Sequence, residues 1–409
     1  MKQHSRVRSE HGSILLLVAG GLLALMALST FVFDYGVMWV ARRQAQNAAD
    51  AGALSGAVAL AFDPGAHDVG ALGLGTKAKQ SAIVVASANR VWGQSPDNAR
   101  NTVTVSFAVP CPLDTASECL RVDVFRDVAA GNPLPMFFGQ LVGLTQQGVR
   151  AVALSQAVVA DASDCLKPWA IPDKWLDHHD ETPAIDVDTW TADDTYEKLF
   201  GNGLNKGNPL PDPDVYTKPG FKLADDMGRE VVLKYGDAQQ TIAPGNFFPV
   251  ALPTWDGASK GASDYRKNIA QCNGIPVQIG DEVTTEPGNM IGPTRQGMEE
   301  LIAQDPLATW DPITKTVKNS CAPDHCVPSA AVSPRIVAIP IFDTDYFDQG
   351  KQNGRTQIKV VNILGFFLDQ MQGDDVRGYF TTIPGVKVGI GPQKVNPNAA
   401  FMKVPLLVR

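Results

Sequence analysis

The most constraining feature of the chain is an uncharged apolar stretch of 20 residues near its start, Ile14 to Phe33. As an α-helix this stretch spans about 30 Å, the thickness of the hydrocarbon core of a bilayer. No later stretch approaches this length. The sequence therefore predicts one transmembrane helix over residues 14–33, with residues 1–13 on one side of the membrane and the rest of the chain on the other.

Basic residues flank this stretch unevenly. Lys2, Arg6 and Arg8 precede it, whereas Asp34 follows it at once. Because Lys and Arg are enriched in cytoplasmic loops, we predict a cytoplasmic N-terminus and an ectodomain on the other side of the membrane. A cleaved signal peptide with a small-x-small site at 27–29 is the alternative, but the apolar run is longer than a usual signal core. We expect a retained anchor.

The helical pattern continues beyond the apolar stretch. Residues 35–62 contain no proline and are rich in alanine, which has a high helix propensity. Small residues recur at helical spacing, at Ala41, Ala45, Ala48, Ala49, Gly52 and Gly56. Such rows let another backbone approach closely. This helix-packing face must lie on the chain's own domain or on a neighbouring subunit, and we expect it to receive a partner helix or a filament subunit.

Residues 34–160 read as an α+β module. Two segments alternate apolar and polar residues, Thr102–Val109 and Leu120–Val128, and a third strand is predicted over Val149–Val159. Helices are predicted over Ala78–Trp92 and, as a short apolar helix, over Pro133–Leu144. A long helix followed by a small antiparallel sheet gives a helix-on-sheet arrangement similar to that of pilins.

The rest of the chain divides by composition. Residues 161–242 are crowded with Asp, Pro, Gly and Asn and read as a loop-rich acidic segment. Residues 243–409 alternate short apolar runs with turn residues and read as a β-rich C-terminal domain, interrupted by a helix over Thr294–Ala303. The fold class predicted for the whole chain is therefore α+β.

Charge and motifs exclude several functions. The net charge is −8, and phosphate contacts require a basic face, so we expect no nucleic-acid partner. No nucleophile elbow, zinc-protease motif or phosphate loop is present, so we expect no catalytic residue, cofactor, metal site or small-molecule substrate. A His pair at 178–179 and a partial calcium-loop pattern over 186–197 are better read as solvated loops. Asp34 either pairs with a partner's cation or touches water at the membrane surface.

All six cysteines follow the apolar stretch, at Cys111, Cys119, Cys165, Cys272, Cys321 and Cys326. An even number in an oxidising compartment favours disulfide bonds, for which six cysteines allow 15 connectivities. Sequence proximity suggests the pairs 111–119 and 321–326, which leaves 165 to pair with 272. A zinc site at 321, 324, 325 and 326 is the rival reading, but zinc needs a second pair of ligands that the sequence lacks.

The segment around the apolar stretch resembles the TadE/TadG-like family of Flp pilus-assembly proteins. The shared pattern is Glu10-x-Gly12, the apolar span, Asp34-Tyr35-Gly36, and then Arg42-Arg43-Gln44-x-Gln46-Asn47-Ala48-Ala49-Asp50-Ala51-x-Ala53-Leu54. The resemblance covers about residues 10–60, and the C-terminal extension is more loosely similar to a TadG-like subgroup. The chain departs from that subgroup in lacking a von Willebrand A metal motif. It also has no glycine before Gly12, so we predict no prepilin-peptidase cleavage.

The resemblance implies a single-pass protein of the bacterial inner membrane with a periplasmic ectodomain. Its expected role is non-catalytic, in Flp/Tad-type pilus assembly or envelope anchoring, through helix packing and protein–protein contacts. Its expected partners are other pilus-assembly or pilin-like proteins of the inner membrane and periplasm. The alternative is a membrane-tethered periplasmic enzyme or adhesin whose site lies in the β-rich C-terminal domain.

Overall fold

The chain divides into two compact units. The computed structural model describes residues 11–108, 110–113, 118–176, 194–196, 214–236, 242–255, 257–258, 261–288, 290–322, 325–329, 333–350, 355–388 and 395–408. The first unit comprises Met1–Ala59, Ala66–Gln156 and Leu406–Arg409, and the second comprises Leu60–Gly65 and Ala157–Pro405. The second unit is therefore inserted into the sequence of the first.

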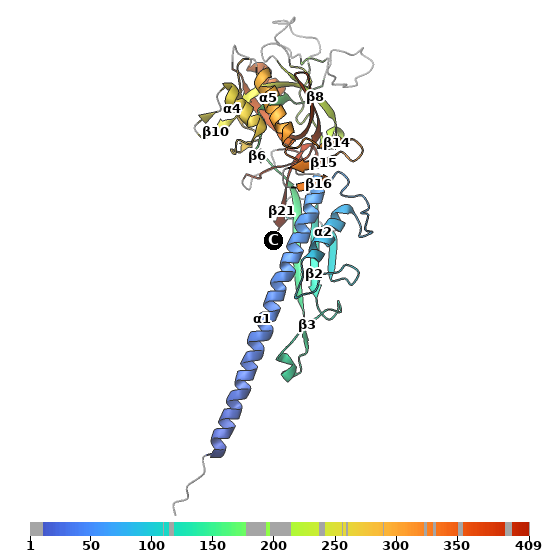
Figure 1. Ribbon diagram of the computed structural model, residues 1–409, viewed down its shortest axis with the longest axis vertical. Coiled ribbons are helices and arrows are strands. Elements are labelled where there is room, and N and C mark those ends of the chain that lie inside the picture. The colour runs from blue at the N-terminus through green and yellow to red at the C-terminus, as the bar shows by residue number, and fades with distance from the viewer. Residues whose placement is uncertain are drawn as a thin grey trace, which may run out of the picture. The chain divides into compact units, whose positions relative to one another are not determined.

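A single long helix, α1, opens the described chain. It runs without interruption from His11 to Phe62, as the blue ribbon of Figure 1 shows. Its N-terminal part is long and apolar enough to cross a membrane, and the side chains from Ile14 to Leu28 are almost all exposed. The predicted long apolar helix is therefore confirmed, and it continues into the small-residue segment as one helix.

The first unit places α1 against an antiparallel sheet. Strand β1 (Val103–Ala108) pairs with β2 (Cys119–Arg126), and β2 pairs with β5 (Val149–Val159). Helix α2 (Lys77–Ala88) begins where the Thr76 hydroxyl accepts a hydrogen bond from the Lys79 amide. Figure 1 shows α2 and β2 beside the C-terminal half of α1. The β-branched and aromatic residues of these strands favour extended backbone, and Val103, Val122 and Val124 are buried in the core of the unit.

The prediction of a short helix over Pro133–Leu144 is wrong. The segment forms a hairpin of β3 (Leu134–Pro135) and β4 (Gln146–Gln147), with the 3-10 helix η1 (Gly139–Val142) at its tip. Gly143 ends η1 with φ at +84°, a left-handed conformation that glycine adopts without steric cost. This glycine and the paired flanks favour a turn over a continuous helix.

The second unit is built on a sheet that closes on itself. The strands of its ring pair in the order β17–β18–β19–β8–β9–β7 and back to β17, and β13 bridges β18 and β9. Their bounds are β7 Trp169–Pro172, β8 Glu230–Tyr235, β9 Asn246–Ala251, β13 Glu282–Thr285, β17 Ile336–Phe342, β18 Gln357–Gln372 and β19 Asp375–Thr381. The pairings include both parallel and antiparallel ladders, so the sheet is mixed. The β-rich C-terminal region is thereby confirmed.

Aromatic residues fill the core of the second unit. Phe248 and Phe347 stack with ring centroids 5.0 Å apart, and Phe248 also contacts Phe342 at 5.6 Å. Trp169 and Phe366 are completely buried. Helices α4 (Gly261–Ala270) and α5 (Ile291–Ala303) pack against each other, with Tyr265 hydrogen-bonded to Thr294 between them.

Shorter elements complete the second unit. They are β6 Ala162–Ser163, α3 Leu223–Asp226, β10 Pro253–Thr254, β11 Gly257–Ala258, β12 Val277–Gln278, β14 Thr309–Asp311, β15 Thr316–Ala322, β16 His325–Ser329, α6 Thr344–Gln349, β20 Ile383–Pro384 and η2 Pro397–Ala399. The last strand, β21 (Met402–Val408), begins beside β20 in a parallel pair. Strands β7 and β8 come from residues 161–242 and join the same ring as the later strands.

Candidate functional site

The packing face of α1 is buried within the first unit. The four alanines at 41, 45, 48 and 49 are fully inaccessible to solvent, and Gly52 and Gly56 are also buried. Ala53 and Ala57 extend the same inaccessible surface. All six positions of the predicted face are thus buried along the second half of the helix.

The chain's own α2 and sheet occupy this face. A Cβ added to Gly52 would lie 2.8 Å from the Ala82 carbonyl oxygen, and one added to Gly56 would lie 2.5 Å from Leu120 Cδ2. The matching alanines of α2, Ala78, Ala82 and Ala86, are fully buried. Two helices approach this closely only where both carry small residues.

This finding corrects the expectation that a partner helix or filament subunit receives the small-residue face. The sequence left two occupants open, the chain's own domain or a neighbouring subunit. The structure fills the face with the chain's own domain, because α2 and β2 cover it.

Polar residues in the Arg- and Gln-rich part of α1 attach loops and strands to this helix. The Gln44 side-chain oxygen accepts a hydrogen bond from the Trp92 amide at 2.7 Å. Gln46 donates to the Val152 carbonyl of β5 at 3.1 Å. On the next turns of the helix, the Ser155 hydroxyl donates to the Ala53 carbonyl at 2.5 Å. These residues hold the sheet in register along the helix.

Asp34, which follows the apolar stretch, is the most heavily bonded side chain of the motif. Its carboxylate accepts hydrogen bonds from the amides of Phe137 and Gly139, both at 2.7 Å. The Phe138 amide lies 3.2 Å from one carboxylate oxygen and 3.4 Å from the other. Gln147 also donates to the Asp34 main-chain carbonyl at 3.2 Å. Asp34 therefore fixes the tip of the β3–β4 hairpin to α1.

This arrangement corrects both readings of Asp34 made from the sequence. The side chain is buried rather than in contact with water, and backbone amides rather than a partner's cation satisfy its charge. Sequence reasoning missed its partners because they lie more than 100 residues away. The only local signal was the pair of glycines at 139 and 143 within an apolar run.

The opposite side of α1 stays open. Leu54 and Val58, four residues apart on one face of the helix, are 38% and 41% exposed, and Asn47 precedes them on the same side. These three residues form a stripe, the outward stripe, on the part of α1 that lies beyond the apolar stretch. It faces away from the buried alanines and glycines of the packing face.

The structure contains disulfide bonds, and each described cysteine sulfur takes part in one. Cys111 bonds to Cys119 next to the β1–β2 connection, and Cys165 bonds to Cys272 across 107 residues of the second unit. Cys321 is also disulfide-bonded and lies directly opposite Cys326 in the β15–β16 register. The side chains at 324–326 lie outside the described residues, as do the His pair at 178–179 and most of the calcium-like segment, residues 186–193 and 197.

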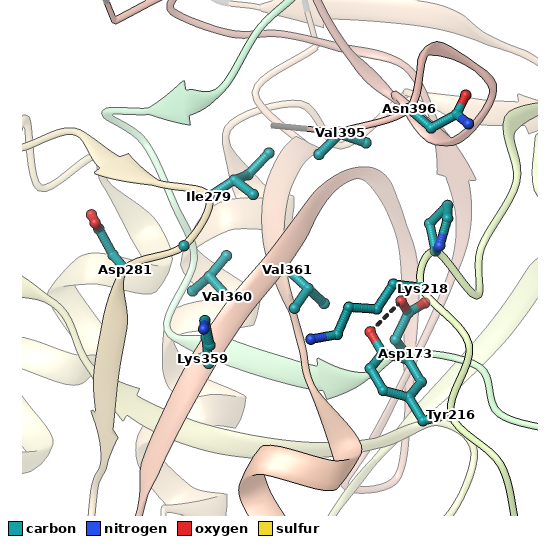
Figure 2. Close-up of a pocket in the computed structure, with 12 residues that line it drawn as sticks. Asp173, Tyr216, Lys218, Ile279, Asp281, Lys359, Val360, Val361, Val395 and Asn396 are labelled. Carbon is teal, nitrogen blue, oxygen red and sulfur yellow. Dashed lines mark hydrogen bonds between the residues drawn. The ribbon is translucent and has the colours of Figure 1, made fainter. Parts of the chain in front are cut away.

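The second unit has a pocket of about 720 Å³, shown in Figure 2. Asp173 and Tyr216 lie on one side, joined by a 2.8 Å hydrogen bond, and Lys218 lies next to them. Lys359 and Asp281 line the opposite side. The pocket therefore combines an apolar floor of valines with ionisable groups on its rim.

Three ionisable side chains of this pocket, those of Asp173, Tyr216 and Lys218, form hydrogen bonds or ion pairs. Besides the Tyr216 hydroxyl, the Asp173 carboxylate accepts the amides of Lys174, Gly220 and Phe221 at 3.0 to 3.1 Å. Burial raises the pKa of the Asp173 carboxyl and that of the Tyr216 hydroxyl. Lys218 forms an ion pair with Asp343. Among the residues that the structure describes, no three His, Cys, Asp or Glu side chains gather where they could hold a metal ion.

Comparison with known proteins agrees with the motif at the start of the chain. Residues 12–59 match the family described as "Putative Flp pilus-assembly TadE/G-like", which confirms the resemblance for that segment. No curated protein matches the chain, and no solved structure does. The matched segment is the one that carries Asp34, Gln44, Gln46 and the packing face.

Proposed function

We propose that this chain is a single-pass inner-membrane protein that acts in Flp/Tad-type pilus assembly or in envelope anchoring, without catalysis. The observation that carries the proposal is that residues of the matched segment make the contacts that hold the loops and the sheet on α1. Within residues 12–59, Asp34, Gln44 and Gln46 each accept or donate a hydrogen bond that attaches the loops or the sheet of the first unit to α1. The matched segment thus serves both as the membrane anchor and as the helix on which the sheet of the first unit packs.

The proposed orientation places the N-terminus in the cytoplasm and the chain beyond the apolar stretch in the periplasm. The basic residues before the apolar stretch support this orientation. The disulfide bonds of both units also support it, because such bonds persist in the periplasm and are rare in the cytoplasm.

The proposed mechanism is contact with other pilus-assembly or pilin-like proteins through the outward stripe. Leu54 and Val58 lie about 30 Å and about 36 Å beyond Asp34 along the helix axis, so this surface stands clear of the membrane. A pair of apolar side chains at this spacing suits a partner helix.

A deletion and complementation experiment in the native host tests this proposal. Loss of the gene should abolish Flp pili, and the full chain should restore them. The double variant Leu54→Glu/Val58→Glu should fail to restore pili while its amount in the membrane is unchanged. Val84→Glu, on an exposed position of α2, is the matched control and should restore pili. Normal pili after the deletion would contradict the function, whereas normal pili with the double variant would contradict only the surface.

The second candidate is a binding or catalytic function of the second unit, and the pocket of Figure 2 is the observation that favours it. The variants Asp281→Ala and Lys359→Ala change its rim without touching α1. If pili form normally but adhesion to surfaces is lost, the pocket carries the function. If both pili and adhesion are unchanged, the packing role stands.

A further inference from the structure

The tip of the β3–β4 hairpin exposes large apolar side chains. Phe137 is 56% exposed and Leu144 is 57% exposed, on either side of η1. Neither side chain contributes to the core of the first unit. A contiguous exposed apolar patch marks a site of contact with protein or membrane, so what lies beside these two side chains decides their role.

The hairpin tip is fixed to α1 at the end of the apolar stretch. The amides of Phe137 and Gly139 bind the Asp34 carboxylate, and the ring of Phe138 lies 5.4 Å from that of Phe33. Figure 1 shows the segment after β3, in green, extending along α1 on the side of its N-terminal half. The exposed side chains are therefore held at the level where the apolar stretch ends.

Neighbouring residues of α1 carry the features of a membrane interface. Tyr35 and Trp39 are both about half exposed, one turn apart, directly after the apolar stretch. Trp and Tyr concentrate at the level of the lipid headgroups. The Arg43 guanidinium lies 4.5 Å from the centre of the Trp39 ring, where its charge can also reach lipid phosphates.

We propose that the tip of this hairpin enters the lipid bilayer beside α1, as a second membrane contact. The occupant of its apolar surface is lipid, because the tip contacts the end of the membrane span through the Phe33 and Phe138 rings, and Val32 and Phe33 are themselves exposed there. Phe137 and Leu144 then lie between the headgroups and the acyl chains of the leaflet on the C-terminal side of the span. Two contacts set the tilt and rotation of the first unit on the membrane, which a single helix leaves free.

Spin labels on the full chain test this inference. The variants Phe137→Cys and Leu144→Cys are labelled with a nitroxide without reductant and reconstituted in vesicles of phosphatidylcholine and phosphatidylglycerol. Leu113→Cys is the matched control, because Leu113 is an apolar loop residue with 55% exposure. The Leu113 amide donates a hydrogen bond to the Gln156 side chain. Gln156 pairs with Cys119 at the start of β2, which is the end of the sheet away from the apolar stretch. The measurement is the ratio of relaxation by oxygen, which enters lipid, to relaxation by a water-soluble nickel chelate.

At positions 137 and 144 this ratio should be several-fold higher than at position 113. Asp34→Asn in the Phe137→Cys background should lower the ratio, because the tip is released from α1. Equal ratios at 137, 144 and 113 would place the tip in water and overturn the inference. Protection from both reagents would also overturn it, because the tip would then be covered by protein. The experiment needs no pilus, so it stands apart from the proposed function.

Discussion

Replacing Asp34 by Asn should loosen the β3–β4 hairpin without unfolding the chain. The carboxylate accepts two short hydrogen bonds, from Phe137 and Gly139, and two longer ones from Phe138. Asn keeps one acceptor oxygen and turns an NH₂ group toward the other donors. The variant therefore loses one short charge-assisted bond and leaves one buried amide without an acceptor, which costs about 1.5–3 kcal/mol.

Hydrogen exchange reports this cost directly. Because about 1.4 kcal/mol corresponds to a factor of ten, amides over residues 134–147 should exchange roughly 10–100 times faster in the variant. The assay is mass spectrometry on the full chain in lipid nanodiscs. Asp50→Asn is the matched control on the same helix, because Asp50 accepts a bond from Gln46 rather than from the hairpin. If both variants exchange alike over this segment, Asp34 does not hold the hairpin.

Three further predictions concern packing, the cross-link and a buried lysine. Gly52→Leu should destabilise the first unit by about 1–3 kcal/mol or more, because the added side chain overpacks the contact with α2. Gly36→Leu is the control and should leave the stability unchanged, because a side chain there meets open space. The measurement is the thermal unfolding temperature of each purified variant. Removing the Cys165–Cys272 bond with paired Ser substitutions should cost about 2–5 kcal/mol in denaturant titrations of the second unit, and no change would contradict its role as a staple. Burial lowers the pKa of Lys167 to about 8 from 10.5, so the unfolded chain binds more protons between these values. Stability should therefore rise by up to about 3 kcal/mol from pH 8 to 10.5, and Lys167→Met should remove this rise.

The sequence predicted the elements that local patterns define. The apolar stretch, the continuation of its helix and the three predicted strands all lie within a few residues of their observed bounds. These elements depend on propensity and periodicity, which a window of ten to twenty residues contains.

Elements that depend on distant partners could not be predicted. The row of small residues at 41–56 indicated a close neighbour, but spacing carries no information on whether that neighbour is the same chain. The partners of Asp34 lie at 137–139, and no local pattern links them to it. The ring of the second unit also brings β7, at 169–172, beside β17, at 336–342, across more than 160 residues.

The closed ring of strands in the second unit has a consequence for how this unit associates with other chains. A sheet with open edges presents unpaired N–H and C=O groups, to which a foreign strand can add. In the ring, β7, β8, β17 and β19 each pair on both sides, and β9 and β18 each have three neighbours. Adding a foreign strand to the ring therefore requires the ring to break first, whereas the separate β14–β15–β16 sheet of the same unit keeps β14 and β16 as edge strands.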